Sequence, residues 1–162
     1  MQPAFYPGSF DPITYGHLNI IERALGMDVF SEITVLLAVN PNKVPLFSTE
    51  ENLELIRQAT GQWPQVRADE TEGLITDYAR QRDIHIAIRG LRAVTDFENE
   101  FSMALTNREL WPEFDTLFLM TRSDYMYLSS TVVRQVAQMG GDVEHFVPPC
   151  VARKLREKFG HR

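Results

Sequence analysis

Cysteine is nearly absent from the sequence: Cys150 stands alone among 162 residues, so no disulfide can form within the chain. A chain without disulfides is typical of a reducing compartment. The first ten residues, MQPAFYPGSF, contain neither a basic segment nor a long apolar one, so we expect no signal peptide. No run of about 18 apolar residues occurs either, which predicts that there is no transmembrane helix. We therefore expect a cytoplasmic protein.

Basic residues are also few. The chain has 16 lysines and arginines against 22 aspartates and glutamates, which gives a net charge of −6 at pH 7. An acidic chain lacks the basic face that attracts nucleic acid or an anionic membrane, so we expect neither partner. A small anionic ligand remains compatible with this charge, because a pocket needs only a few local cations. The length of the chain fits one domain over residues 1–162.

Several common motifs are missing. There is no GxxxxGK[ST], which argues against a P-loop nucleotide binder, and no GxGxxG, which removes the usual dinucleotide fingerprint. Without a GxSxG elbow, a serine hydrolase has no support. The single cysteine and the histidines are too scattered to indicate a zinc site: Cys150, His17, His85, His145 and His161. We expect no metal ligands among the protein side chains.

Strand and helix patterns alternate along the whole chain. Short apolar runs predict strands at 4–6, 33–39, 65–70, 84–88 and 116–120. Helical spacing of apolar residues predicts helices at 17–25, 49–60, 74–82, 97–110, 130–139 and 149–160. Five strands that alternate with helices predict the α/β class, with a five-stranded parallel sheet, right-handed crossovers and helices on both faces.

The loop after the first predicted strand, PGSFDPITYGH, contains groups that suit a phosphate. In open parallel sheets, ligands bind outside the carboxyl ends of the strands. Gly8 lets the backbone approach a ligand, Ser9 has two donors, and the helix that begins near His17 has free amides at its positive end. The alternative is an ordinary turn before a helix, with His17 exposed or capping.

Cations follow two other strands. Lys43 lies in NPNKVP after the second strand, and Arg89 and Arg92 flank a glycine in IRGLR after the fourth. Arginine offers a planar fork of donors for phosphate oxygens. The alternatives are a solvated lysine and surface ion pairs between these arginines and the acidic residues of the next helix. Those carboxylates favour a solvated helix face over a metal cluster: Asp96, Glu98 and Glu100.

Three consecutive hydroxyl residues, Ser129 to Thr131, lie where the fifth predicted helix begins. One of them is expected to be the N-cap, which leaves the others free for a ligand. Arg134 follows one turn later. Four of the five loops at this edge of the sheet thus carry cations, hydroxyls or glycines that suit phosphate, and this convergence favours a phosphate-binding site over isolated capping.

Taken in order, the segments YPGSFDPITYGH, NPNKVPLF, IRGLRAVTDFENE, NRELWPE, YLSSTVVRQVA and GGDVEHFVPP resemble the bacterial phosphopantetheine adenylyltransferases over nearly the whole chain. The TxGH and SST motifs mark only the wider nucleotidyltransferase superfamily, whereas IRGLR followed by DFENE is more specific. The resemblance implies a Rossmann-like nucleotidyltransferase fold and the penultimate step of coenzyme A biosynthesis. ATP and 4′-phosphopantetheine would give dephospho-coenzyme A and pyrophosphate, with Mg²⁺ as cofactor. It also implies a homohexamer.

Matched positions imply the site residues. Those implied for ATP are Ser9, Phe10, His17, Gly90, Leu91, Arg92, Glu100, Tyr125, Met126, Tyr127, Leu128, Ser129, Ser130 and Thr131. Those implied for phosphopantetheine are Ser9, Lys43, Leu74, Ile75, Arg89 and Asn107. In the implied reaction the donors to the reacting phosphates are His17 at the α-phosphoryl, Lys43 between the two substrates, and Arg92 and Ser130, with Ser129, at the leaving phosphates. The acceptor is already anionic, so no general base is expected.

The chain departs from the family pattern at two places. It has Tyr15 where the family often has asparagine, and Arg134-Gln135 where a Lys-Glu pair is common. Two other functions stay open from the sequence. One is a related adenylyltransferase with a different phosphate acceptor, such as nicotinate mononucleotide. The other is a non-catalytic nucleotide sensor, although a sensor has no chemical need for both His17 and Lys43.

Overall fold

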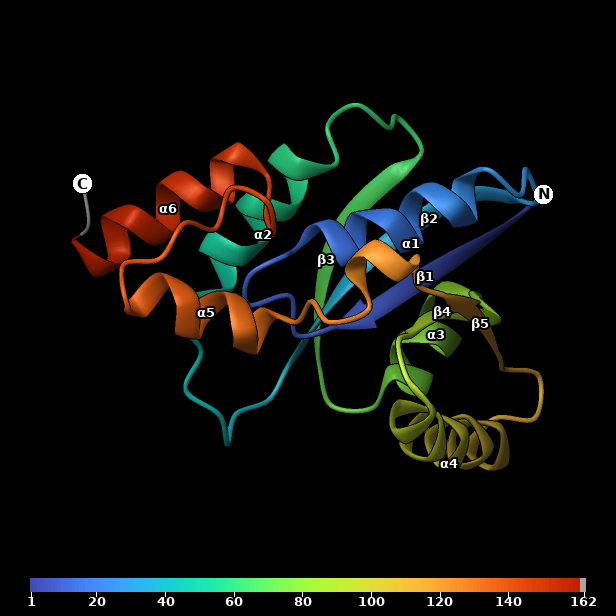
Figure 1. Ribbon diagram of the computed structural model, residues 1–162. Helices are drawn as coiled ribbons and strands as arrows, with labels where there is room; N and C mark the ends of the chain where they lie inside the picture. The colour runs from blue at the N-terminus through green and yellow to red at the C-terminus, as the bar shows by residue number, and fades with distance from the viewer. Residues whose placement is uncertain (161–162) are drawn as a thin grey trace.

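A parallel β-sheet lies at the centre of the molecule (Figure 1). The computed structural model describes residues 1–160, except for the side chains of residues 94 and 95. In this part of the chain the five strands are β1 (Gln2–Gly8), β2 (Phe30–Val39), β3 (Val66–Glu72), β4 (Ile86–Leu91) and β5 (Asp115–Met120). The helices are α1 (Tyr15–Leu25), α2 (Thr49–Ala59), α3 (Ile75–Arg82), α4 (Val94–Leu110), α5 (Ser130–Gln138) and α6 (Pro149–Phe159), with a 3-10 turn η1 (Ser123–Tyr125).

Helices cover both faces of the sheet. Successive side chains of a strand point to opposite faces, and along β1 Ala4 and Tyr6 join the larger core cluster whereas Phe5 joins the second. Residues of α1, α2, α5 and α6 belong to the larger cluster, while α3 contributes Tyr78 and Ala79 to the second. Figure 1 shows α3 and α4 on the side of the sheet away from α2, α5 and α6. The predicted fold class is confirmed.

The strand order β3-β2-β1-β4-β5 places a change of direction at β1. From β1 the chain moves outward through α1 and α2 to β2 and β3, and α3 then brings it back to β4 on the other side of β1. The loops that leave β1 and β4 therefore diverge toward opposite faces. Such a switch point leaves a crevice at the carboxyl ends of the strands, where open α/β sheets bind their ligands.

Strand β4 ends later than the sequence predicts. The expected end at residue 88 is wrong, because Arg89 pairs with Phe118 and Gly90 with Leu119 in the ladder between β4 and β5. Strands β1 and β3 also extend further toward their carboxyl ends than their apolar runs suggest. Pairing with a neighbouring strand, which no local pattern records, carries these polar residues into the sheet.

The helix ends follow local sequence signals. Ser48 and Glu51 form the predicted capping box, in which the Glu51 N–H donates to Ser48 Oγ at 3.1 Å and the Ser48 N–H donates to Glu51 Oε2 at 2.9 Å. Helix α6 begins at Pro149 and is followed by Gly160 with a φ of 68°. Glycine adopts this left-handed conformation without a steric cost, so it ends the helix as predicted.

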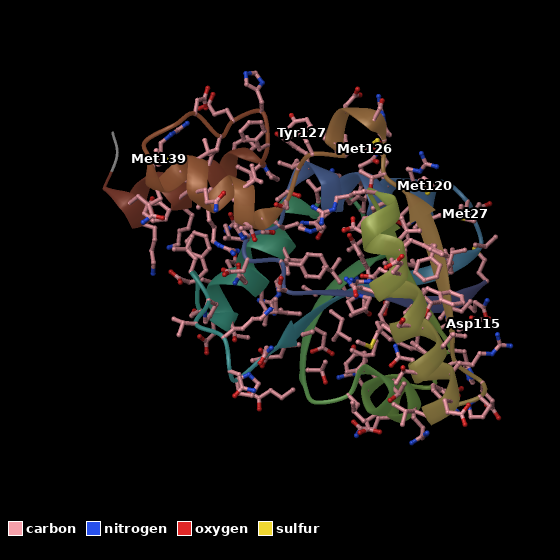
Figure 2. All side chains as sticks on the ribbon, turned by 60° about the horizontal axis from the view of Figure 1, so that its bottom comes forward. Met27, Asp115, Met120, Met126, Tyr127 and Met139 are labelled. Atoms are coloured by element: carbon pink, nitrogen blue, oxygen red, sulfur yellow. The ribbon has the colours of Figure 1, made fainter. Side chains whose placement is uncertain are left out.

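One face of α4 is apolar and exposed. Phe97, Phe101 and Leu105 are 43%, 46% and 53% exposed, and the Phe97 ring lies 6.3 Å from that of Phe118 on β5. Figure 2 shows α4 alongside β5, with Met120 at the surface. Among the helices within residues 1–160, none has both the length and the apolar character that a membrane crossing requires.

Candidate active site

A pocket of about 910 Å³ lies over the carboxyl ends of β1, β2 and β4. Each of the loops that converge there contributes to its wall. Ser9 and Phe10 follow β1, Lys43 follows β2, Arg92 follows β4, and Ser130 begins α5. The sequence therefore located the cavity correctly from the ends of the predicted strands.

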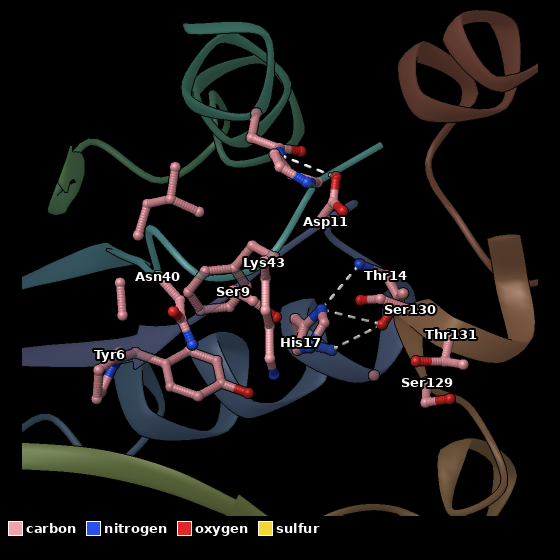
Figure 3. A pocket seen from close by; sticks show the side chains of 18 of the residues that line it. Tyr6, Ser9, Asp11, Thr14, His17, Asn40, Lys43, Ser129, Ser130 and Thr131 are labelled. Atoms are coloured by element: carbon pink, nitrogen blue, oxygen red, sulfur yellow. Dashed lines mark hydrogen bonds between the residues drawn. The ribbon is translucent and has the colours of Figure 1, made fainter. Parts of the chain in front are cut away.

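His17 lies at the third position of α1 and closes a capping box with Thr14. The Thr14 N–H donates to Nδ1 of His17 at 3.0 Å, and the His17 N–H donates to Oγ1 of Thr14 at 3.4 Å (Figure 3). Because Nδ1 accepts a backbone hydrogen bond, a neutral ring carries its proton on Nε2. The capping role that the sequence left open is therefore real, and it leaves one ring N–H for a ligand.

The surroundings of His17 keep the imidazole neutral. Burial, together with the positive charges of Arg92 and Arg89, lowers its pKa from 6.5 to about 3. The ring also packs edge-on against Phe10, with 4.9 Å between the ring centroids. Phe10 has a φ of 40°, a left-handed conformation that costs a residue with a side chain of order 1 kcal/mol. At neutral pH His17 thus presents a fixed, uncharged hydrogen-bond donor.

Lys43 reaches the same pocket from the loop after β2. Its side chain extends from the loop after β2 into the space that the His17 ring also faces (Figure 3). The loop itself is exposed and has no regular structure, although the Lys43 N–H donates to the carbonyl of Asn40 at 3.1 Å. An ammonium group and a ring N–H on the same space suit an anionic oxygen between them.

Both arginines of IRGLR form ion pairs with α4. Arg89 donates from Nε to Glu100 Oε2 at 2.8 Å and from Nη2 to Oε1 of the same carboxylate, and its Nη1 donates to the Pro7 carbonyl. Arg92 donates from Nε to Asp96 at 3.3 Å and from Nη1 to the Leu128 carbonyl at 2.9 Å. The ion pairs that the sequence left as an alternative are therefore present.

These pairs do not use every donor of the two guanidinium groups. Arginine has five N–H donors, and both Arg89 and Arg92 line the pocket. The carboxylates hold the arginines in place and leave donors for a phosphate. Gly90, between them, lacks a side chain for a steric reason, since a Cβ there would lie 2.8 Å from Cγ1 of Ile20 on α1.

The three hydroxyls at the start of α5 have different partners. Ser129 is the N-cap, and its Oγ accepts from the Val132 N–H at 3.2 Å. Ser130 donates from Oγ to the Pro12 carbonyl at 2.7 Å, and Thr131 Oγ1 accepts from Arg134 at 3.3 Å. All three line the pocket. The hydroxyl protons of Ser129 and Thr131, and the unpaired amides of the first turn, are the groups that suit a ligand here.

Seven of the matched positions do not line this pocket. Leu91 is buried in the core, Asn107 is buried on α4, and Leu74 is exposed before α3. The implied site residues that do not contribute to the described pocket wall are Leu91, Tyr125, Met126, Tyr127, Leu74, Ile75 and Asn107. Their contact with a ligand stays a prediction.

Sequence reasoning missed several polar residues of the pocket wall, among them Asp11, Thr14 and Asn52. Thr14 had a usable signal, because a threonine three residues before a helical polar residue is the spacing of a capping box. Asp11 and Asn52 gave none, since the hydrogen bond between their side chains joins residues that lie 41 positions apart. Tyr15 does not belong to the pocket wall; its N–H donates to the Phe146 carbonyl at 2.9 Å.

Comparisons with known proteins agree with this fold and site. Residues 5–136 match the cytidylyltransferase-like family. The phosphopantetheine adenylyltransferase of Heliobacterium modesticaldum is 48% identical over 160 residues, which cover 99% of this chain and 94% of that protein. The protein of the same name from Syntrophotalea carbinolica is 51% identical over 156 residues, which cover 96% of this chain and 93% of that protein.

A solved structure shares the fold. It is the Plasmodium falciparum nicotinic acid mononucleotide adenylyltransferase complexed with NaAD, with a TM-score of 0.71 over 98% of this chain and 96% of that chain. The sequence identity of 14% limits this likeness to the fold. This chain belongs to the cytidylyltransferase-like family of nucleotidyltransferases. Its relatives with about half of their residues identical narrow the assignment further: it is a member of the phosphopantetheine adenylyltransferase family, as the sequence motifs predicted.

Proposed function

We propose that this protein transfers the adenylyl group of ATP to 4′-phosphopantetheine, giving dephospho-coenzyme A and pyrophosphate. An oxygen of the acceptor phosphate attacks the α-phosphorus of ATP, and the bond from that phosphorus to the β-phosphate oxygen breaks. The observation that carries the proposal is a pocket at the switch point in which His17 and Lys43 face one space. Full-length relatives with this named activity support it.

The chemistry needs positioned donors more than it needs a base. A phosphate monoester is already anionic near neutral pH, so the main obstacle is the approach of two anions and the charge that develops on the α-phosphoryl group. Nε2–H of neutral His17 would donate to an α-phosphoryl oxygen. Lys43 would place its charge between the attacking phosphate and the α-phosphoryl group, which also holds the two reactants close together.

The leaving pyrophosphate would lie against the part of the pocket wall that Arg92 and the N-terminus of α5 form. Arg92 is held by Asp96 and by a backbone carbonyl, so its remaining donors would meet the β- and γ-phosphates without reorganising. The N-terminus of α5, with Ser129 and Ser130, would add backbone amides and the positive end of the helix dipole. Arg89, held by Glu100, is assigned to the phosphate of the acceptor.

Mg²⁺ belongs to the same proposal. Within residues 1–160, no group of three or more His, Cys, Asp or Glu side chains is arranged to hold a metal ion. Three pocket carboxylates are engaged elsewhere: Glu100 with Arg89, Asp96 with Arg92, and Asp11 with backbone amides. This donor set fits a cation that triphosphate oxygens and water hold, as is usual for Mg²⁺. When bound, Mg²⁺ would neutralise phosphate charge. His161, one of the scattered histidines, lies outside the described residues.

The direct test is an assay of pyrophosphate release by purified protein with ATP, Mg²⁺ and 4′-phosphopantetheine. We expect pyrophosphate and dephospho-coenzyme A in equal amounts. Replacing the acceptor by nicotinate mononucleotide should abolish the signal, and a signal of equal size would instead make this a related adenylyltransferase. ATP binding without product from either acceptor, at micromolar enzyme, would favour the sensor.

The His17→Ala variant tests the assigned donor. Removing one preorganised donor to a developing oxyanion costs on the order of 10²–10³ in turnover, so we expect a loss of that size. Because the donor acts mainly in the transition state, the dissociation constant for ATP should change by less than about tenfold. An equal loss of ATP affinity would show that His17 binds the ground state instead.

We propose further that the chain is a homohexamer in the cytoplasm. The single cysteine supports the location. The exposed apolar face of α4, with Phe97, Phe101 and Leu105, supports self-association, since contiguous apolar surface of this kind marks an interface. Sizing by light scattering tests the assembly: we expect six copies for the wild type and a smaller species for Phe101→Glu. A monomeric wild type would contradict it.

A further inference from the structure

Asp11 lies in the loop between β1 and α1, and the residue is only 7% exposed. Both carboxylate oxygens accept hydrogen bonds from one distant segment. Oδ2 accepts from the Leu46 N–H at 2.8 Å, and Oδ1 accepts from the Phe47 N–H at 3.0 Å. The side-chain amide of Asn52, on the first turns of α2, also donates to Oδ1 at 3.1 Å. The carboxylate thus receives three donors from the chain that follows Lys43.

The loop that carries Lys43 has mainly local bonds of its own. The Asn42 N–H donates to the Asn40 side chain at 3.0 Å, and the Lys43 N–H donates to the Asn40 carbonyl at 3.1 Å. Residues 40–45 are exposed, and Val44 is 99% exposed. These bonds shape the turn without attaching it to the rest of the molecule. Strand β2 attaches the loop at one end, and the Asp11 carboxylate attaches it at the other.

The same aspartate is also joined to α5. Arg134 donates from Nη1 to the Asp11 backbone carbonyl, and Nη1 lies 3.6 Å from Oδ2 of the carboxylate. The Arg134 side chain therefore offsets the charge of Asp11 in a place that excludes most water. Three parts of the pocket wall meet at this residue: the loop after β1, the loop after β2 and the helix that begins with Ser130.

We propose that Asp11 is a positioning residue, whose carboxylate holds the Lys43 loop so that the lysine ammonium group faces the same space as His17. The inference rests on the proposed function, in which Lys43 acts on the reacting phosphates. Asp11 acts through the loop and not on the substrates, because its oxygens are occupied by Leu46, Phe47 and Asn52.

The Asp11→Asn variant tests this role in the full-length protein. An asparagine keeps the size of the side chain but turns one acceptor into a donor, which faces a backbone N–H. Displacing a positioned group by about 1 Å can cost on the order of 100-fold in rate, so we expect kcat to fall about 10- to 100-fold. The KM for ATP should stay within about threefold, because the His17 and Arg92 contacts are unchanged.

A double variant separates positioning from a general structural role. If Asp11 acts through Lys43, the Asp11→Asn change should alter kcat by less than about threefold when Lys43→Ala is already present. The matched control is Asp69→Asn, which removes a carboxylate that accepts from Tyr78 at 2.9 Å and from Arg82 at 2.8 Å on β3, away from the pocket. Its effect should be small and should multiply with that of Lys43→Ala.

Two results would overturn the proposal. One is an unchanged kcat for Asp11→Asn. The other is a loss that is as large in the Lys43→Ala background as in the wild type. If Asp11→Asn does not unfold cooperatively, the Asn52→Ala variant replaces it, because it removes a single donor to the same carboxylate. Its loss in kcat should be smaller, and it too must shrink when Lys43→Ala is already present.

Amide hydrogen exchange tests the attachment without any reaction. We expect the amides of Leu46 and Phe47 to exchange at least about tenfold faster in Asp11→Asn than in the wild type, since their acceptor is weakened. Unchanged exchange would overturn the attachment. If the wild type released no pyrophosphate with 4′-phosphopantetheine, the proposed function would fail while this measurement still decided whether Asp11 holds the loop.

Discussion

The low pKa of His17 makes the stability of the fold depend on pH in a predictable way. Its pKa is 6.5 when unperturbed and about 3 in the folded protein. Between these values the unfolded state binds more protons than the folded state, so the free energy of unfolding falls as the pH decreases below 6.5. The slope is about 1.36 kcal/mol per pH unit where the two states differ by one proton. From pH 7 to pH 4.5 the loss is roughly 2.5 kcal/mol.

The His17→Gln variant isolates this contribution. Glutamine at the third helical position can still accept from the Thr14 N–H, as in an ordinary capping box, but it does not titrate. Urea unfolding of wild type and variant at pH 7 and pH 4.5 should show that the wild type loses up to about 2.5 kcal/mol more. That figure is an upper value, because His17 is only partly buried.

Two further measurements test whether the pH dependence comes from His17. The His145→Gln variant removes an exposed histidine and gives the background for losing any histidine. Long-range ¹H–¹⁵N spectra of labelled wild type should show the His17 ring neutral and protonated on Nε2 at pH 5.5. Parallel pH dependence of wild type and His17→Gln, or an imidazolium signal at that pH, would refute the reasoning.

Three further changes have expected outcomes. Thr14→Val removes the Oγ1 acceptor but keeps the backbone donor to His17, so we expect about 1 kcal/mol less stability by urea unfolding with turnover within about threefold. Ser129→Ala removes the N-cap of α5 and should also cost about 1 kcal/mol, whereas Ser129→Asp should restore the stability. Gly90→Ala would place a Cβ 2.8 Å from Ile20, and overpacking of this kind costs about 1–3 kcal/mol; an unchanged melting temperature would contradict the packing argument.

The parts of the fold that depend on local pattern were predictable. The apolar run at 33–39 lies within β2, and the Ser48–Glu51 pair begins α2 as expected. These signals need only neighbours in the sequence. The carboxyl ends of the strands were not predictable, because Arg89 and Gly90 belong to β4 only through their pairing with β5. No propensity of arginine or glycine indicates that pairing.

The candidate site divides in the same way. The convergence of loops placed Ser9, His17, Lys43 and Arg92 on one pocket, because the ends of parallel strands share one edge of the sheet. The hydrogen bonds that hold the loops of the pocket in place were not predictable from the sequence. Asp11 contacts residues 35 to 41 positions later in the chain. A buried polar contact between residues so far apart produces no periodic pattern in the sequence.

Gly90 sets the distance between α1 and β4 at the pocket. The side chain of Ile20 occupies the place that a Cβ at residue 90 would need, so α1 and β4 approach each other more closely than any other amino acid would allow. His17 lies one turn before Ile20, and Arg92 follows Gly90 by two residues. The separation between the neutral donor and the cation is therefore a spacing built into the scaffold. A larger residue at position 90 would widen this gap without altering either side chain, so Gly90 controls the geometry of the pocket independently of the chemical groups that line it.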